Sequence, residues 1–184
     1  ANGNYLEMLT NTNAEIKGSA NVQLQLTTGN QYSIVFWAAA PSAPYTLDFA
    51  KKTVTVDYTS AKSNDENRDA FYSYHTFTVS AKTEKVQLQR PFAQLNIGTN
   101  DYDLSKKAGY EPTMSYVKVP VYSRLNFADG KVMGEAASVL FDYAAIPSTD
   151  AFPVDGYEYL AMNYLLVSAD QELVDITFGY YDNS

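Results

Sequence analysis

The stretch Val86-Gln87-Leu88-Gln89-Arg90-Pro91-Phe92-Ala93-Gln94-Leu95-Asn96-Ile97 decides the fold class of this chain. Apolar and polar side chains alternate along much of it, which is the period of a β-strand with one buried face. Arg90-Pro91 interrupts the alternation, and a proline inside such a run indicates a bulge, a bend or an edge strand because it has no N–H to donate. The stretch therefore predicts either two strands or one broken strand.

Alternation with the same period appears before this stretch. Val22, Leu24 and Leu26 alternate with polar residues, a turn follows at residues 27–30, and Tyr32–Ala40 is a nearly continuous apolar run. This pattern predicts a hairpin whose first strand is half exposed and whose second strand is buried. Within the run, Ile34-Val35-Phe36-Trp37 is expected on a central strand covered on both faces. Replacing Phe36 by alanine should then cost about 3 to 5 kcal/mol.

Further strand-like stretches follow along the chain, separated by Gly, Pro and Asn. They lie at Thr53–Tyr58, Tyr116–Tyr122, Leu125–Phe127, Val139–Ala144, Tyr159–Val167 and Leu173–Tyr181. Asp129-Gly130 is expected to turn the third of these back into Val132, and Ser168-Ala169-Asp170-Gln171 is expected to join the last two as a hairpin. Many short strands in this arrangement predict a mainly β protein, an antiparallel β-sandwich.

Helix is expected in only one or two short segments. Ser63 and Glu66 have the spacing of a capping box, which predicts a helix over residues 64–74 with His75 at its end. A second helical turn is expected over Leu104–Ala108, ended by Gly109. Because a helix dipole favours a histidine at the C-terminus, a structural role for His75 is favoured over a catalytic one.

The composition excludes several classes of protein. The chain has 184 residues, of which 21 are acidic and 13 basic, so its formal net charge is −8. Because no cluster of Lys and Arg is present to neutralise phosphates, nucleic acid is not expected as a partner. The absence of cysteine rules out disulfides, zinc–thiolate sites and a cysteine nucleophile. No apolar run approaches the roughly 18 residues of a membrane-spanning helix, and the start at Ala1 leads us to expect a processed chain.

We expect no enzymatic activity and no cofactor. Glycine-rich phosphate loops and the patterns G-x-S-x-G and H-E-x-x-H do not occur in the sequence. The oxygen-rich stretch Asn64–Asp69 raises the question of a calcium site. It lacks the turn glycine and the spaced bidentate glutamate of an EF-hand loop, so helix capping and solvation are the favoured interpretation.

Sixteen tyrosines are the unusual feature of the composition. They gather at Tyr157, Tyr159 and Tyr164 and again at Tyr180-Tyr181. Exposed tyrosine rings can stack on sugars or form an interface with another protein. Tyrosine is also a favoured strand residue that fills half-buried positions, and this is the interpretation we favour.

Several segments together resemble one known family. The central segment is Val86–Ile97, in which Arg90-Pro91-Phe92-Ala93 joins two strand-like stretches, and Trp37 lies in the earlier run Tyr32–Ala40. The other segments are Pro44-Tyr45, Asn64–Phe71, Ala144–Pro147 and Tyr159–Tyr164. In this order they are similar to the fimbrillin-like (type V pilin, Mfa-like) surface proteins of the Bacteroidales.

The resemblance implies a transthyretin-like β-sandwich, often two lobes in tandem, in a lipoprotein precursor that is exported and displayed outside the outer membrane. Members of that family polymerise by strand exchange, in which proteolysis removes an N-terminal strand and a terminal strand of another subunit fills the groove. The implied function is therefore a structural subunit of a cell-surface fimbria that takes part in adhesion, with other copies or related pilins as partners. The alternative is a surface-exposed carbohydrate-binding or adhesive lipoprotein.

For this chain, we expect a first lobe at residues 1–147 and the start of a second at residues 148–184, unless the chain is one domain. The strand-exchange groove is expected between Asn21–Leu26 and Leu173–Tyr181. Its residues would be Val22, Leu24, Leu26, Val174, Ile176 and Phe178. Arg90, which lies inside an apolar stretch, is expected to be paired or to lie against an aromatic face.

Overall fold

Strands make up most of the regular structure of this chain. The computed structural model describes residues 18–19, 21–80, 84–147, 150–170 and 173–182. The strands are β1 (Gln31–Ala39), β2 (Tyr45–Asp48), β3 (Thr53–Val56), β4 (Ala70–Thr78), β5 (Ala93–Thr99), β6 (Pro112–Val121), β7 (Arg124–Asn126), β8 (Lys131–Met133), β9 (Ala137–Ala145), β10 (Glu158–Leu165) and β11 (Thr177–Asp182). The helical segments are the 3-10 turn η1 (Glu66–Arg68) and the helix α1 (Tyr102–Lys107).

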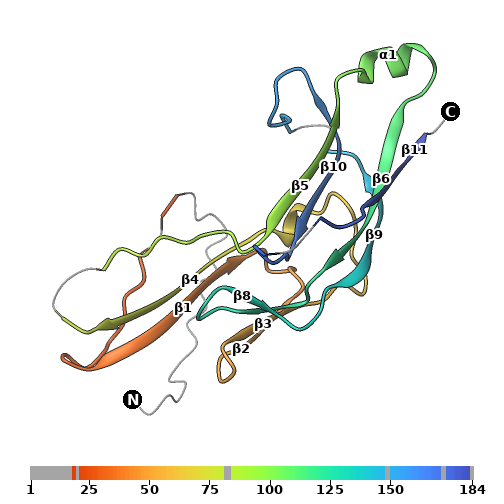
Figure 1. Ribbon diagram of the computed structural model, residues 1–184. Coiled ribbons are helices and arrows are strands. Elements are labelled where there is room, and N and C mark those ends of the chain that lie inside the picture. The colour runs from red at the N-terminus through yellow and green to blue at the C-terminus, as the bar shows by residue number, and fades with distance from the viewer. Residues whose placement is uncertain (1–17, 20, 81–83, 148–149, 171–172, 183–184) are drawn as a thin grey trace.

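Within the described residues, the strands form four antiparallel sheets that pack in two pairs. Sheet β1–β4 packs against sheet β2–β3–β7–β8, and we call this pair the first sandwich. Sheet β10–β5 packs against sheet β11–β6–β9, and we call this pair the second sandwich. Figure 1 shows the two sandwiches at opposite ends of an elongated molecule, with α1 at the far end of the second. The prediction of a mainly antiparallel β-sandwich with one or two short helices is confirmed.

The core of the first sandwich brings together side chains from both of its sheets. Val54 and Val56 of β3 are buried while Thr55 between them is exposed, as the alternation predicts. They pack in one cluster with Tyr72 of β4 and Leu125 of β7. Burial of one face of each sheet is therefore what holds this pair together.

The second sandwich has a core of the same kind. Val117, Val119 and Val121 on the inner face of β6 are almost completely buried, and Lys118 points to the outer face. Phe141 of β9 is 0% exposed and lies in the same cluster. Residues of β5, β10 and β11 cover this cluster from the facing sheet and the sheet edge.

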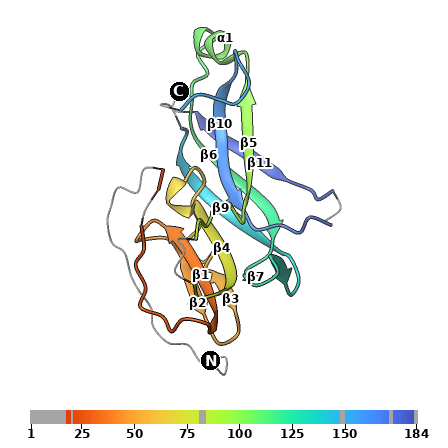
Figure 2. The ribbon, with the colours of Figure 1, turned by 90° about the vertical axis from the view of Figure 1, so that its left-hand side faces the viewer.

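A bent two-stranded ribbon connects the two sandwiches. β6 continues into β7 after a break of two residues, and β8 continues into β9. β7 pairs with β8 in the first sandwich, and β6 pairs with β9 in the second. The turn between β7 and β8 contains Gly130 with φ +72°, which confirms the hairpin predicted at Asp129-Gly130. Figure 2 shows this ribbon running along the molecule from β7 to β9.

The predicted hairpin between Val22–Leu26 and Tyr32–Ala40 is wrong. Residues 21–26 form no strand, and β1 pairs instead with β4, with Phe36 opposite Ser73. Because sheet β1–β4 has only two strands in the described chain, β1 is not a central strand, and Phe36 and Trp37 are half-buried. The apolar run reflects one face packed on the core and a second face that is partly covered.

The predicted helix over residues 64–74 is also wrong. Only Glu66–Arg68 is helical, and strand β4 begins at Ala70. Asp65, rather than Ser63, caps the turn, since its carboxylate accepts a hydrogen bond from the Asn67 N–H. His75 therefore lies within β4 opposite Ile34, where its ring stacks on Phe77 at 5.6 Å. The second helix is confirmed as α1, and Gly109 follows its end with φ +91°.

The strands near the end of the chain do not pair with each other as predicted. β10 pairs with β5 and β11 pairs with β6, so residues 168–171 do not close a hairpin. Both strands thus belong to sheets with strands that precede residue 147, and the sheets do not divide at that residue. In the stretch Val86–Ile97, only the second half forms a strand, β5, while Gln89 makes an isolated bridge to Tyr72.

Candidate functional site

The turn Arg90-Pro91-Phe92-Ala93 is held by an ion pair. The sequence predicts that Arg90 has a partner but not which residue it is. Arg90 Nε lies 2.7 Å from Asp69 Oδ1, and Arg90 Nη2 lies 2.8 Å from Asp69 Oδ2, so the two side chains meet through two parallel hydrogen bonds. The guanidinium also lies over the ring of Phe71 at 5.1 Å and over the ring of Tyr164 at 5.5 Å. The expectation that Arg90 is paired or lies against an aromatic face is confirmed on both counts.

Phe92 and Trp37 meet through a third ring. Tyr45 stacks on Phe92 with centroids 5.4 Å apart, and Trp37 lies edge-on to Tyr45 at 5.3 Å. Pro91 lies between the Gln89 bridge and the start of β5 at Ala93, where no ladder hydrogen bond is needed from its nitrogen. The residues named from the resemblance thus gather on the first sandwich, near the junction with the second.

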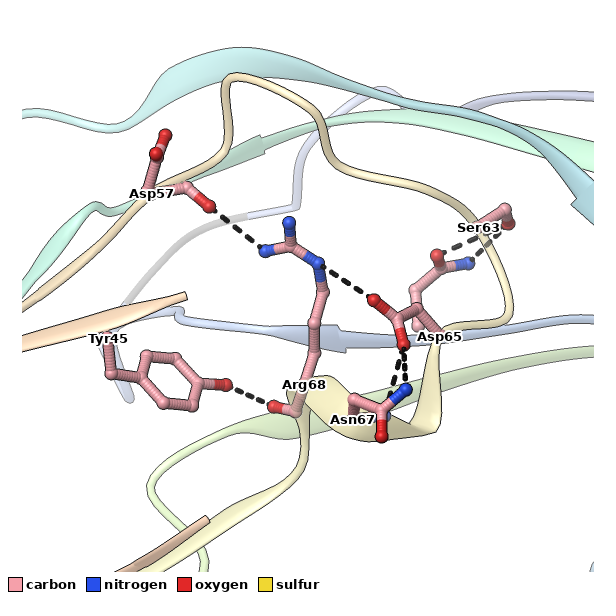
Figure 3. Close-up of polar contacts among 7 residues, drawn as sticks. Tyr45, Asp57, Ser63, Asp65, Asn67 and Arg68 are labelled. Carbon is pink, nitrogen blue, oxygen red and sulfur yellow. Dashed lines mark hydrogen bonds and ion pairs between the residues drawn. The ribbon is translucent and has the colours of Figure 1, made fainter. Parts of the chain in front are cut away.

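Arg68 is a buried cation at that junction, and the sequence analysis did not single it out. Its side chain is 7% exposed, and its Nη1 donates to the carbonyl oxygen of Asp57 at 3.2 Å (Figure 3). Asp65 Oδ2 lies 3.7 Å from Arg68 Nε, which is an ion pair without a hydrogen bond. The guanidinium also lies over the ring of Tyr58 at 5.6 Å. Asp65 therefore compensates the charge of Arg68 while capping η1.

Burial of two tyrosines beside Arg68 changes their titration. Tyr45 donates its hydroxyl proton to the carbonyl oxygen of Arg68 (Figure 3). Burial raises the pKa of Tyr45 well above its ordinary value, and burial likewise raises the pKa of Tyr58 to about 12. Both phenols stay neutral at physiological pH, so this region supplies no phenolate that could act as a base or nucleophile.

A polar cluster joins the two sheets of the second sandwich. Ser63 and Asn163 are buried and bond to each other at 3.2 Å (Figure 3). Asn64, with φ +60°, accepts a hydrogen bond from the Met162 N–H at 2.8 Å and donates to Ser115 Oγ at 3.1 Å. Its amide also donates to the carbonyl oxygens of Ala144 and Ala145, at 3.3 and 2.9 Å. The segment at residues 61–64 is therefore bonded to β6, β9 and β10.

The sequence carried one signal for this cluster. Asn163 is an amide within the otherwise apolar run Leu160–Val167, and a buried amide needs a partner. Nothing local indicates that the partner is Ser63, because 100 residues separate the two. Arg68 gave no signal of its own, since charged residues surround it in the sequence.

The proposed strand-exchange residues do not form one groove. The segment at residues 21–26, in which Val22 and Leu24 are exposed, lies beside the first sandwich, whereas the segment at residues 173–178 leads into β11 at the edge of the second (Figures 1 and 2). Leu26 is half-buried, and Phe178 packs against the second core. The structure therefore separates the predicted groove into two apolar surfaces at different ends of the molecule.

The predicted tyrosine clusters have different environments. Tyr159 and Tyr164 are buried in β10, which agrees with the favoured strand interpretation, and Tyr157 stacks on Phe152 at 5.8 Å. Tyr180 and Tyr181 are exposed on β11. These five residues therefore form no single platform for a ligand.

Side chains of the oxygen-rich stretch Asn64–Asp69 form hydrogen bonds and ion pairs within the protein. Asn64 joins the sheets, Asp65 caps η1 and pairs with Arg68, and Asp69 pairs with Arg90. In the described part of the chain, no group of three or more His, Asp or Glu side chains is placed to hold a metal ion. No helix there is long and apolar enough to cross a membrane.

These features define a protein of two antiparallel β-sandwiches. Arg68 lies near the junction between them, and the polar cluster joins the two sheets of the second sandwich. The chain belongs to a family of unknown function, DUF6562, whose model matches residues 4–184. Comparisons with curated proteins and with solved structures give no match.

Proposed function

We propose that this protein is a structural subunit of a cell-surface fimbria, that it takes part in adhesion, and that it assembles by β-strand exchange with other copies or related pilins. The proposal includes an extracellular location on fimbriae or the outer membrane and no enzymatic activity. It rests on the resemblance of Val86–Ile97 and its companion segments to fimbrillin-like proteins, and on one surface of the second sandwich.

The observation that carries the proposal is the apolar segment before β11. Leu173 is fully exposed, and Val174 and Ile176 are 38% and 44% exposed. Residues 173–176 belong to no sheet and lead directly into β11, the edge strand of sheet β11–β6–β9. An apolar segment beside an edge strand favours addition of a strand from another chain, which would supply hydrogen bonds and cover the side chains.

This observation refines where strand exchange would occur. The edge at β11 has both a strand to pair with and apolar side chains to cover, whereas Val22 and Leu24 lie in a segment without a ladder. We therefore place the exchange at residues 173–182. An incoming strand would extend sheet β11–β6–β9 by one member.

The test uses cells that make the protein, examined by negative-stain electron microscopy with antibody labelling. The double variant Val174→Glu, Ile176→Glu should stop incorporation into filaments, because two buried carboxylates at the new interface would lack partners. Leu104→Glu is the matched control, since Leu104 of α1 is also exposed and lies away from this edge. Wild-type protein that labels no filament, or a double variant that assembles like the control, would contradict the proposal.

A further inference from the structure

An open groove lies along the outer edge of β9 in the second sandwich, where the segment before Ser63 bridges to Asp142. Its volume is about 560 Å³, and one wall is the segment from Tyr58 to Lys62. The other wall is β9 itself, through Ser138, Leu140 and Asp142. The groove is within the size range of small-molecule sites, and it combines hydroxyl groups, the apolar side chains of Val139 and Leu140, and one pair of charges.

The charged pair sits where the two walls meet. Lys62 Nζ lies 2.6 Å from Asp142 Oδ2, and both side chains are about half exposed, at 52% and 50%. The backbone around them is fixed, because the Ser63 N–H donates to the Asp142 carbonyl oxygen and the Asp142 N–H donates to Ala61. The Lys62 ammonium holds the pKa of Asp142 below its ordinary value, so the carboxylate is charged at neutral pH.

A bulge in β9 contains both Asp142 of the groove wall and the neighbouring Tyr143, which belongs to an aromatic pair. The register of β6 and β9 shifts between Ser115 and Val117, so that Tyr116 alone lies opposite both Asp142 and Tyr143. The Tyr116 and Tyr143 rings contact each other, with centroids 4.8 Å apart. Since Phe141 points into the core, the residues of the bulge that follow it lie toward the outer face.

The aromatic pair is held in place from below. Gly179 of β11 lies opposite Tyr116, and a Cβ added at Gly179 would collide with the Tyr116 ring. The Tyr116 ring therefore lies close to the backbone of β11 at Gly179, and Tyr143, which is 40% exposed, contacts this ring and follows Asp142 in β9. Because Tyr143 packs against the Tyr116 ring and is itself partly exposed, it should lose little conformational entropy when a ligand stacks on it.

We propose that the groove beside β9 and the tyrosine pair together bind a neutral oligosaccharide. The C–H face of a pyranose would stack on Tyr143, and its hydroxyls would donate to Asp142 and accept from Lys62. Ser138 and the hydroxyls of the opposite wall would bond to the neighbouring sugar. This binding is separate from strand exchange, because the groove lies on β9 and the exchange edge lies on β11, at opposite edges of one sheet.

Charge favours a neutral ligand over an anionic one. Lys62 is compensated by Asp142, so the groove has no excess positive charge, and the chain as a whole carries a net charge of −8. A polyanion would be repelled by this field and would find no uncompensated cation in the groove wall. A sugar instead needs donors and acceptors side by side, which the Lys62–Asp142 pair supplies.

The test is affinity electrophoresis of the isolated subunit in native gels that contain glycogen, galactomannan, xyloglucan or yeast mannan. At least one of these neutral polysaccharides should slow the wild-type protein, and calorimetry with the corresponding hexasaccharide should then give its Kd. Tyr143→Ala should weaken that binding at least tenfold. Tyr110→Ala is the matched control, because Tyr110 is exposed and follows the end of α1.

A second pair of variants separates binding from folding. Tyr143→Phe keeps the ring and should bind like the wild type, whereas Asp142→Asn removes the charged acceptor and should weaken binding with little change in melting temperature. Migration that none of the four polysaccharides slows would overturn the proposal. Retardation by heparin alone, or equal loss of binding in Tyr143→Ala and Tyr110→Ala, would overturn it too. Filament assembly plays no part in this measurement, so its result is independent of the fimbrial proposal.

Discussion

Arg90 connects three segments of the chain through one side chain. It pairs with Asp69 through two hydrogen bonds and covers the rings of Phe71 and Tyr164. Replacing Arg90 by alanine should lower the free energy of unfolding by about 1 to 2 kcal/mol, since both the forked ion pair and the ring contacts are lost. Arg90→Lys should recover only part of this, because an ammonium cannot form both parallel bonds.

Urea unfolding of the variants measures this loss, and Lys51→Ala provides the comparison. Lys51 pairs with Asp48 at 3.2 Å, but its side chain is 78% exposed. An exposed pair of this kind contributes little to stability, because solvent screens it. Equal losses in Arg90→Ala and Lys51→Ala would show that the Arg90 contacts add nothing beyond an ordinary surface pair.

Asn64 offers a second prediction at the scale of the residue. Alanine at this position would lose the bonds to Met162 and Ser115 and would have to adopt φ +60°. We expect Asn64→Ala to lower the free energy of unfolding by roughly 3 kcal/mol, because buried partners are left unsatisfied and the backbone is strained. Asn64→Gly should lose about 1 kcal/mol less, since glycine accepts the backbone conformation. Thermal and urea unfolding check both values. An alanine variant as stable as the wild type would show that the hydrogen bonds of Asn64 do not stabilise the fold.

Among the elements, β1 and β9 should respond differently to the same change. Phe141 of β9 is completely buried, whereas Phe36 of β1 is half-buried in a two-stranded sheet. Phe141→Ala should therefore cost about 3 to 5 kcal/mol through the cavity that it leaves. Phe36→Ala should cost clearly less, contrary to the expectation from the sequence, because solvent already reaches that side chain. Denaturant midpoints of the two variants compare these costs directly, and a larger loss at Phe36 would contradict this fold.

The sequence predicted strands well where the information is local. The alternation of Val54 and Val56 about Thr55 indicates β3, and Asp129-Gly130 indicates the hairpin of β7 and β8. Partners of strands could not be predicted in this way, because the pairing of β1 with β4 and of β10 with β5 depends on contacts between distant segments. The helix predicted after Ser63 failed for a local reason, since Asp65 caps one short turn and Ala70, Tyr72 and Tyr74 then alternate inward.

The sites could be predicted only in part, for the same reason. The position of Arg90 within an apolar stretch indicates that its charge needs a partner, but only the fold brings Asp69 to it. The groove beside β9 depends on the bridge between Lys62 and Asp142, which are 80 residues apart, and no local pattern specifies that pairing. A single residue thus indicates that its side chain needs a partner, and the pairing of strands decides which residue that partner is.

At the scale of the whole molecule, alkaline pH should lower the free energy of unfolding. Burial raises the pKa of Tyr58 to about 12 and raises that of Tyr45 as well, so the folded state holds protons that the unfolded chain releases near pH 10. The stabilising contribution is fully present below pH 10 and is lost as the pH rises toward 12. For Tyr58 alone, the loss should reach about 2 to 3 kcal/mol.

Urea unfolding at pH 8, 10 and 11 measures this loss, and phenolate absorbance shows whether the phenols ionise only on unfolding. Tyr58→Phe removes the ionisable hydroxyl and keeps the ring over which Arg68 lies. Its free energy of unfolding should fall less steeply between pH 10 and 11 than that of the wild type. Parallel pH profiles for the two proteins would exclude Tyr58 as a source of the alkaline loss.

The polar cluster that joins residues 61–64 to β6, β9 and β10 also constrains the order in which the chain can fold. Ser63 and Asn163, which bond to each other, are 100 residues apart, and Asn64 needs the Met162 N–H. During synthesis, β5 and the segment at residues 61–64 therefore wait for their partners until β10 has left the ribosome, whereas β1 and β2 can pair earlier with β4 and β3. Contacts between such distant residues form slowly, because the chain loses the entropy of the closed loop before the contacts stabilise it. The second sandwich should accordingly remain incomplete, and accessible to chaperones, until β10 has been made.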